Sequence, residues 1–226
     1  MLFKTRGVVF SYIKFKETSI IAKVFTEDFG LQSYVVNGIR SSKGHSRIAL
    51  YQPLTLLDMV VYKNDQKTIQ CISECKCDFP FKTITRDMRK SAVAMFWSEL
   101  LNKTIRDEGL EDVEKFNFIR DSLISLDMAS QGVENYPLIF GLNFCRHLGF
   151  GMEDARTVID EFGSNHSQES DVLAAYIDSI LDGTEIHKCA PDLRRRALNY
   201  LVSYYQLHHD GFSKMKSVDI LKQVFS

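Results

Sequence analysis

The sequence predicts an α+β protein, with an N-terminal five-stranded OB-type β-barrel over residues 1–80 followed by an all-helical domain over residues 81–226. Two observations predict this division. Up to Pro80 the apolar residues form short runs rich in β-branched and aromatic side chains, and beyond it they recur at spacings of three and four. Five strands within 80 residues is the size of an OB-type barrel. An SH3-like barrel fits the same pattern, so the topology stays open.

Turn signals separate the predicted strands. The segment 27–30 ends on a glycine, and Lys63, Asn64 and Asp65 follow another apolar run. Glycine, asparagine and aspartate are typical of tight turns because they accept the backbone angles that such turns need. The predicted strands cover residues 7–16, 19–26, 31–36, 54–62 and 68–75.

The segment beyond Phe79 and Pro80 has the apolar period of helices. Gly132 and Gly149 stand where helices would end, and Pro191 stands where one would begin. Four apolar faces are predicted: Val93, Phe96, Trp97, Leu100, Leu101 and Ile105; Phe116, Ile119, Leu123 and Leu126; Tyr136, Ile139, Phe140, Asn143 and His147; and Leu198, Leu201, Val202 and Tyr205.

Charge is distributed unevenly along the chain. Residues 1–80 hold 11 basic and 7 acidic residues, a net charge of +4, whereas the remainder holds 17 basic and 22 acidic residues, a net charge of −5. Three of the cations, Arg40, Lys43 and Arg47, lie with two glycines between predicted strands. Such a loop can neutralise phosphates, which indicates a polyanionic partner for the N-terminal part. A solvated loop that only keeps the barrel soluble is the alternative.

Composition argues against membrane and secreted classes. No apolar run approaches the roughly 18 residues of a membrane helix, and the N-terminus lacks the apolar core of a signal peptide. The five cysteines are odd in number and irregular in spacing, which fits reduced thiols rather than a disulfide framework. We therefore expect a cytoplasmic protein that does not bind membranes.

The motifs of common enzyme classes are missing from the sequence, including phosphate-binding loops, nucleophile elbows and paired metal-binding cysteines. His208 and His209 would point about 100° apart on a helix, so we interpret them as a polar helix end. Cys71, Cys75 and Cys77 share strand parity, but the first two would lie roughly 13 Å apart, too far for one zinc ion. We expect small buried thiols there and no enzymatic activity.

Six segments of this sequence resemble, in order and spacing, the bacterial recombination mediator family RecO: Lys16-Glu-Thr-Ser19, Val24-Phe-Thr-Glu-Asp-Phe-Gly30, Val36-Asn-Gly-Ile-Arg-Ser41, Tyr51-Gln-Pro-Leu-Thr55, His147-Leu-Gly-Phe-Gly151, and Lys216-Ser217 with Asp219-Ile-Leu221. The resemblance covers nearly the whole chain. It implies an OB-fold joined to a helical domain, binding to single- and double-stranded DNA, and annealing of complementary strands. It also implies cooperation with RecR and with single-stranded DNA-binding protein in loading RecA. A nucleoid-associated location would follow.

Basic residues of the predicted barrel are the candidates for phosphate contacts, because Arg40 matches the arginine of the family's Gly-x-Arg-Ser motif. The candidates are Arg6, Lys14, Lys16, Lys23, Arg40, Lys43 and Arg47. Aromatic residues are interleaved with them, and an exposed ring could stack on a base, although core packing is the alternative for each. These rings are Phe3, Phe10, Tyr12, Phe15 and Tyr34.

The second partner site is expected on the helical domain. The family generally binds the C-terminal tail of single-stranded DNA-binding protein, which is acidic and ends in an aromatic residue. Such a tail needs an apolar pocket beside a cation, and Phe140, Phe144 and Arg146 offer both. Core packing of the two rings is the alternative, and Arg120 and the run Arg194 to Arg196 are the next candidates.

The chain departs from the family at two places. Many members carry a four-cysteine zinc site in the helical domain, whereas only Cys145 and Cys189 occur there, with His166 and His187 at unsuitable spacing. We therefore expect no cofactor and no metal. Leu138 stands with Ile139 where members can carry arginines, which weakens any contact predicted there. A protein-interaction scaffold without a nucleic-acid role is the competing hypothesis, and the two differ in salt dependence.

Overall fold

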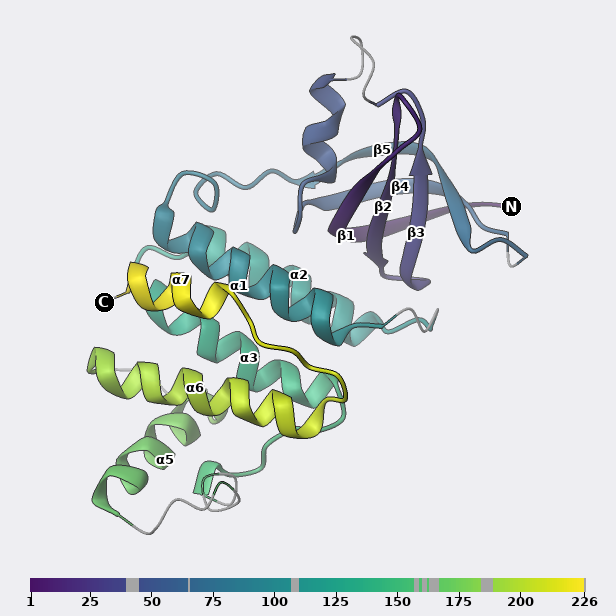
Figure 1. Ribbon diagram of the computed structural model, residues 1–226. Helices are drawn as coiled ribbons and strands as arrows, with labels where there is room; N and C mark the ends of the chain where they lie inside the picture. Colours follow the sequence, from purple (N-terminus) through teal and green to yellow (C-terminus); the bar gives the residue numbers. More distant parts are fainter. Residues whose placement is uncertain are drawn as a thin grey trace. The chain divides into compact units, whose positions relative to one another are not determined.

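The computed structural model describes residues 1–39, 45–64, 66–106, 110–156, 159, 162, 167–183 and 189–225 (Figure 1). The chain divides into two compact units. The first comprises Met1–Lys82 with Ile105–Asp127, and the second comprises Thr83–Thr104 with Met128–Ser226. The compact units differ from the predicted division at residues 80 and 81, because residues 105–127 group with the N-terminal segment. Whether the two predicted domains fold independently stays a prediction.

The first unit contains a closed barrel with the strand order β1-β2-β3-β5-β4. Neighbouring strands are antiparallel except for β3 and β5, which pair in parallel. This order is that of an OB-type barrel, so the predicted fold class is confirmed. The strands are β1 (Leu2–Phe15), β2 (Ser19–Thr26), β3 (Gly30–Val36), β4 (Leu56–Tyr62) and β5 (Ile69–Phe79), and a 3₁₀ helix, η1 (His45–Tyr51), precedes β4.

The observed strands are longer than predicted at two ends. β1 begins at Leu2 because residues 2–8 pair with β4, and β5 continues to Phe79 by pairing with Leu56. Both extensions contain charged residues, which we did not expect within a strand. A lysine that faces outward does not interrupt a strand, because alternate residues face solvent. The barrel core is formed by inward-facing residues, closed by Tyr51 of η1. It contains Val9, Ile20, Ala22, Val24, Tyr34, Val36, Ile39, Tyr51, Leu57, Met59 and Val61.

Helix α2 (Val113–Met128) packs on the outer wall of this barrel. Phe25 faces outward by strand parity, yet it is only 3% exposed. The reason is that its ring meets Phe116 of α2 with centroids 6.4 Å apart and stacks on Phe10 at 5.8 Å. The segment before α2 also contacts the barrel, since a Cβ on Gly30 would lie 2.3 Å from the carbonyl oxygen of Leu110.

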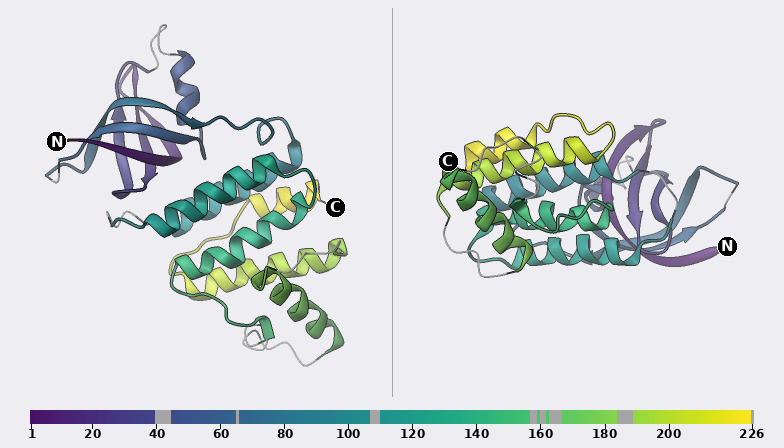
Figure 2. Two further views of the ribbon diagram at one scale, coloured as in Figure 1. Left: turned by 180° about the vertical axis from the view of Figure 1, so that it is seen from behind. Right: turned by 90° about the horizontal axis from the view of Figure 1, so that it is seen from below.

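The second unit is helical and is built around stacked aromatic rings. Trp97 stacks on Phe140 at a centroid distance of 4.5 Å, and Phe140 stacks on Phe144 at 5.2 Å. Figure 2 shows α3 beside α6, and a Cβ on Gly141 would lie 2.4 Å from the Leu201 side chain. The elements are α1 (Met88–Thr104), η2 (Val133–Asn135), α3 (Tyr136–His147), α5 (Gln168–Leu181), α6 (Pro191–His208) and α7 (Ser217–Val224).

The helices of the described residues include none that is both long enough and apolar enough to cross a membrane.

Candidate nucleic-acid interface and partner pocket

Exposed basic residues occur on two segments that lie at the same end of the barrel. Figure 1 shows the β1–β2 turn and the start of η1 at the same end, and the Ser19 hydroxyl bonds Asn37 Oδ1 at 3.0 Å to tie the turn to the connection after β3. Lys14 near the end of β1 and Lys16 on the turn are exposed, as is Arg47 on η1. Exposed cations of this kind can neutralise a phosphate chain.

Two predicted loop residues, Arg40 and Lys43, lie outside the described residues. Lys23 is described and lies on the outer wall of the barrel. It is exposed in the middle of β2, directly opposite Ser11 of β1 and Ser33 of β3. A strand presents alternate residues to solvent, so this lysine has a small polar neighbour on each side.

Arg6 has an intramolecular role that the sequence did not reveal. Its Nε donates to Glu27 Oε2 at 2.7 Å and its Nη2 donates to Glu27 Oε1 at 2.5 Å. The guanidinium also lies 5.4 Å from the Phe116 ring centroid and donates to Asn117 at 3.4 Å. A bidentate pair of this kind uses most of the donors that a phosphate would need. Arg6 therefore attaches α2 to the barrel, and its predicted contact with DNA stays a prediction.

The Arg6 contact also fixes the ionisation of its partner. The hydrogen bond from Arg6 is the largest influence on Glu27 and lowers the pKa of this carboxyl, against the opposing effect of burial. Glu27 is therefore ionised at neutral pH, and the pair links β1 to the turn after β2. Lys4 and Lys76 are likewise directed to a carboxylate, at 3.8 Å and 3.1 Å from Asp58.

Exposure separates the aromatic residues that could stack on a base from those that cannot. Phe10 and Tyr34 are buried at 2% and 0% exposure, whereas Phe3 is 37% exposed and also packs edge-on against Phe29. Tyr62, which the sequence reading did not select, is 49% exposed at the end of β4. Strand parity could have found it, since Leu57, Met59 and Val61 face the core and Tyr62 must then face outward.

The described residues contain no group of three or more histidine, cysteine or acidic side chains placed to hold a metal ion. The expectation of buried thiols was wrong for Cys71, which is exposed, whereas Cys75 and Cys77 are partly buried and Cys145 is buried. Burial raises the pKa of the Cys145 thiol to about 12, so this thiol is protonated and is a weak metal ligand at neutral pH. His166 and His187 lie outside the described residues.

The predicted partner site on α3 is divided between core and surface. Phe140 and Phe144 are 2% and 0% exposed within the aromatic stack, which matches the alternative of core packing. Arg146 is exposed, and its stem lies against Gly151. A tail could reach the two rings only by opening the core.

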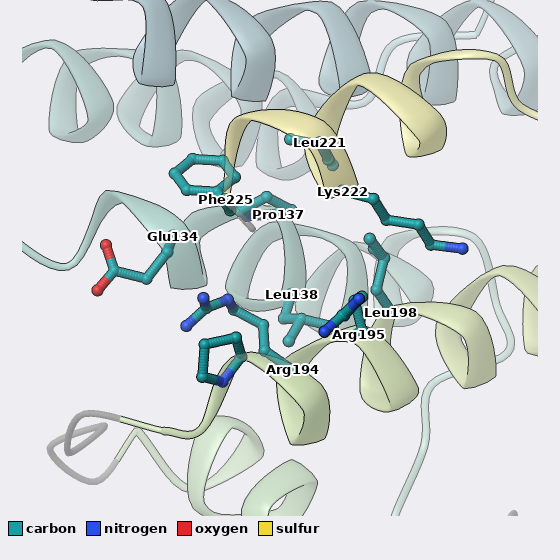
Figure 3. A pocket seen from close by; sticks show the side chains of 10 residues that line it. Glu134, Pro137, Leu138, Arg194, Arg195, Leu198, Leu221, Lys222 and Phe225 are labelled. Atoms are coloured by element: carbon teal, nitrogen blue, oxygen red, sulfur yellow. The ribbon is translucent and has the colours of Figure 1, made fainter.

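A pocket with apolar walls and cations at its rim lies between α3, α6 and α7 (Figure 3). Arg194, Arg195 and Lys222 supply three cations, and the carboxylate of Glu134 is paired with Arg89 at 2.5 Å. The apolar lining comes from Pro137, Leu138, Pro191, Leu198, Leu221 and Phe225. Of the four arginines predicted as reserve candidates, Arg194 and Arg195 line this pocket. Arg196 lies 3.3 Å from Glu169 and Arg120 lies 2.9 Å from Asp121, and neither belongs to the lining.

Comparison with known proteins agrees with these features. The family described as recombination protein O, N terminal, matches residues 1–81. Over 240 residues, which span the whole of both chains, this protein is 33% identical to the DNA repair protein RecO of Flavobacterium psychrophilum. It is also 33% identical to that of Flavobacterium johnsoniae over 242 residues and 28% identical to that of Christiangramia forsetii over 240, again over the whole of each chain. The barrel and the full-length similarity together show that the chain belongs to the RecO family of DNA repair proteins.

Proposed function

We propose that this protein is a non-enzymatic recombination mediator that binds single- and double-stranded DNA and anneals complementary strands. The observation that carries the proposal is the exposure of four cations of the barrel unit: Lys14 and Lys16 at the β1–β2 connection, Arg47 on η1, and Lys23 on the wall. Cations in this arrangement reduce the repulsion between two phosphate backbones that must approach each other. In this role the protein would act with RecR in loading RecA, and it would work at the nucleoid in the cytoplasm.

Salt dependence tests the proposal against a scaffold that only binds proteins. We expect fluorescently labelled single- and double-stranded oligonucleotides to bind, with an affinity that falls steeply as salt rises, because each phosphate contact releases counterions. The measurement is a titration at two or more salt concentrations, with an annealing assay under the same conditions. The absence of binding to both oligonucleotides at low salt would favour the scaffold.

We further propose that the pocket between α3, α6 and α7 takes the tail of single-stranded DNA-binding protein. A terminal aromatic ring would enter the apolar lining, and the acidic residues and terminal carboxylate would meet Arg194, Arg195 and Lys222. Leu138, which stands where family members can carry an arginine, lies in this apolar lining. The C-terminal part has a net charge of −5, and this pocket brings three cations together beside an apolar lining, the combination that an acidic peptide with an aromatic end needs.

A matched pair of arginine substitutions tests the pocket. Arg194→Glu should weaken binding of an acidic peptide with a C-terminal phenylalanine by about 1–3 kcal/mol, the range of a charge-assisted hydrogen bond. Arg196→Glu makes the same charge change on the same helix outside the pocket lining and should weaken binding far less. Equal losses would mean that only overall charge matters, and a loss confined to Arg146→Glu would return the site to the end of α3.

A further inference from the structure

Helix α7 forms one wall of the pocket but is too short to be stable alone. It has eight residues, Ser217–Val224, and isolated helices of fewer than roughly 12 residues are marginal in water. Val218 and Leu221 are buried at 7% and 2% exposure, which attaches its apolar face to the unit. The position of the wall therefore depends on this packing and on what holds the two ends of the helix.

The N-terminal end of α7 is held by a side chain from another helix. Its first residues have no side-chain cap of their own. Instead, Glu99 of α1 accepts hydrogen bonds from the backbone N–H of Lys216 at 3.0 Å, the backbone N–H of Ser217 at 2.8 Å and the Ser217 hydroxyl at 2.6 Å. A carboxylate at this end also interacts favourably with the helix dipole.

The Glu99 carboxylate is kept ionised by its contacts. Burial alone would raise its pKa, but the hydrogen bonds from Ser217 and Lys216, together with Lys103 at 3.8 Å, outweigh burial and lower it. The charge is therefore present at neutral pH, where the three donors need it.

The C-terminal end of α7 reaches the pocket directly. Leu221 and Lys222 of the helix and Phe225 just after it line the pocket, as Figure 3 shows. The Arg89 guanidinium lies 5.3 Å from the Phe225 ring centroid while it pairs with Glu134. Three of the pocket's lining residues thus depend on a helix whose other end is attached through Glu99.

We propose that Glu99 is a positioning residue of the partner pocket: its carboxylate holds α7 in place, and α7 in turn supplies Leu221, Lys222 and Phe225. This inference rests on the proposed tail-binding function. By thermodynamic linkage, a peptide in the pocket must stabilise the attached position of α7, and loss of the attachment must weaken binding of the peptide.

The test measures peptide affinity and hydrogen exchange on the full chain. Glu99→Ala should accelerate exchange at residues 217–225 and weaken an acidic peptide with a C-terminal phenylalanine about tenfold, a typical coupling between linked sites. Glu99→Gln should fall between, because the amide oxygen accepts hydrogen bonds without the charge. The control Glu153→Gln, at an exposed glutamate of the same unit outside the pocket lining, should match the wild type. Saturating peptide should slow exchange in α7 of the wild type.

Each contrary result has a separate meaning. Faster exchange in Glu99→Ala with unchanged affinity would overturn the role of α7 in the pocket, and unchanged exchange would overturn the attachment by Glu99. A wild-type chain that fails to bind the peptide would instead overturn the proposed partner. If Trp97 fluorescence shows that Glu99→Ala unfolds the unit, Ser217→Ala provides the test. Ser217→Ala removes only the hydrogen bond from the Ser217 hydroxyl to Glu99 and should lower peptide affinity about threefold.

Discussion

The Arg6→Ala variant distinguishes a structural arginine from a DNA-binding one. The substitution removes two hydrogen bonds to Glu27, a weaker one to Asn117 and the contact with the Phe116 ring. All of these connect β1 to α2 or to the turn after β2. We expect the first unit to lose stability while DNA affinity and its salt dependence stay close to wild type.

The magnitude follows from how far the pair is exposed. The Arg6 and Glu27 side chains are 34% and 21% exposed, so the pair is neither fully exposed nor fully buried. Its contribution should lie between that of a surface ion pair, about 0–1 kcal/mol, and that of hydrogen bonds to charged groups, about 1.5–3 kcal/mol. Adding roughly 0.5 kcal/mol for the cation–π contact gives a loss of about 2 kcal/mol. For a unit of this size that corresponds to a fall in melting temperature of roughly 10 °C.

The pH dependence has a defined sign. Because Arg6 lowers the pKa of Glu27, the pair contributes fully above the unfolded glutamate value of about 4.3 and is lost as pH falls through the lower folded value. The difference between wild type and Arg6→Ala should therefore be constant at neutral pH and shrink in acid.

Thermal unfolding followed by circular dichroism measures the effect. The single tryptophan, Trp97, belongs to the second unit, so its fluorescence checks that this unit is intact. Lys4→Ala is the matched control, since its ammonium is 3.8 Å from Asp58 and its side chain is 75% exposed, and it should change stability by less than about 0.5 kcal/mol. Unchanged stability in Arg6→Ala together with a flatter salt slope would refute the structural assignment and restore Arg6 as a phosphate contact.

Three further predictions test the interface, the packing of α2 and the absence of metal. Replacing the four exposed cations Lys14, Lys16, Lys23 and Arg47 by alanine should reduce the slope of log affinity against log salt for single-stranded DNA by up to about 3, without unfolding the barrel. An unchanged slope would show that these residues do not contact DNA. Gly30→Ala should destabilise the first unit by more than about 2 kcal/mol in urea unfolding, because its Cβ would meet a backbone oxygen. The control Gly38→Ala, which has a similar positive φ but open space around the Cβ, should cost only about 1 kcal/mol. Similar losses in the two variants would contradict the packing. Elemental analysis should find well under one zinc per chain and a chelator should leave the melting temperature unchanged, whereas stoichiometric zinc would show that the cysteines were misinterpreted.

Local pattern was sufficient to predict much of the fold. The alternation of Leu57, Met59 and Val61 is visible in the sequence, as is the helical spacing of Val93, Phe96 and Trp97. Residues such as these gave five strands and the helical class correctly. The order of the strands was not predictable in this way, because an OB-type and an SH3-like barrel have the same run of short strands and differ in how distant strands pair.

The candidate site was less predictable because charge alone does not reveal a partner. Arg6 and Lys14 look alike in sequence, yet a carboxylate 21 residues after Arg6 determines its role. The apolar pocket was hidden for a related reason. Its lining comes from segments near residues 134–138, 191–198 and 221–225, which are brought together only by helix packing.

The grouping of α2 with the barrel has a consequence for how the chain is made. The last strand of the barrel ends at Phe79, but Phe25 on its outer wall is covered by Phe116. A ribosome must therefore synthesise α1, which belongs to the other unit, before it can complete the barrel's cover. During that interval the nascent barrel exposes an aromatic surface, and the helix that follows it has no folded partner yet. Chaperones that recognise exposed aromatic surface would have their best opportunity to bind between the synthesis of β5 and that of α2.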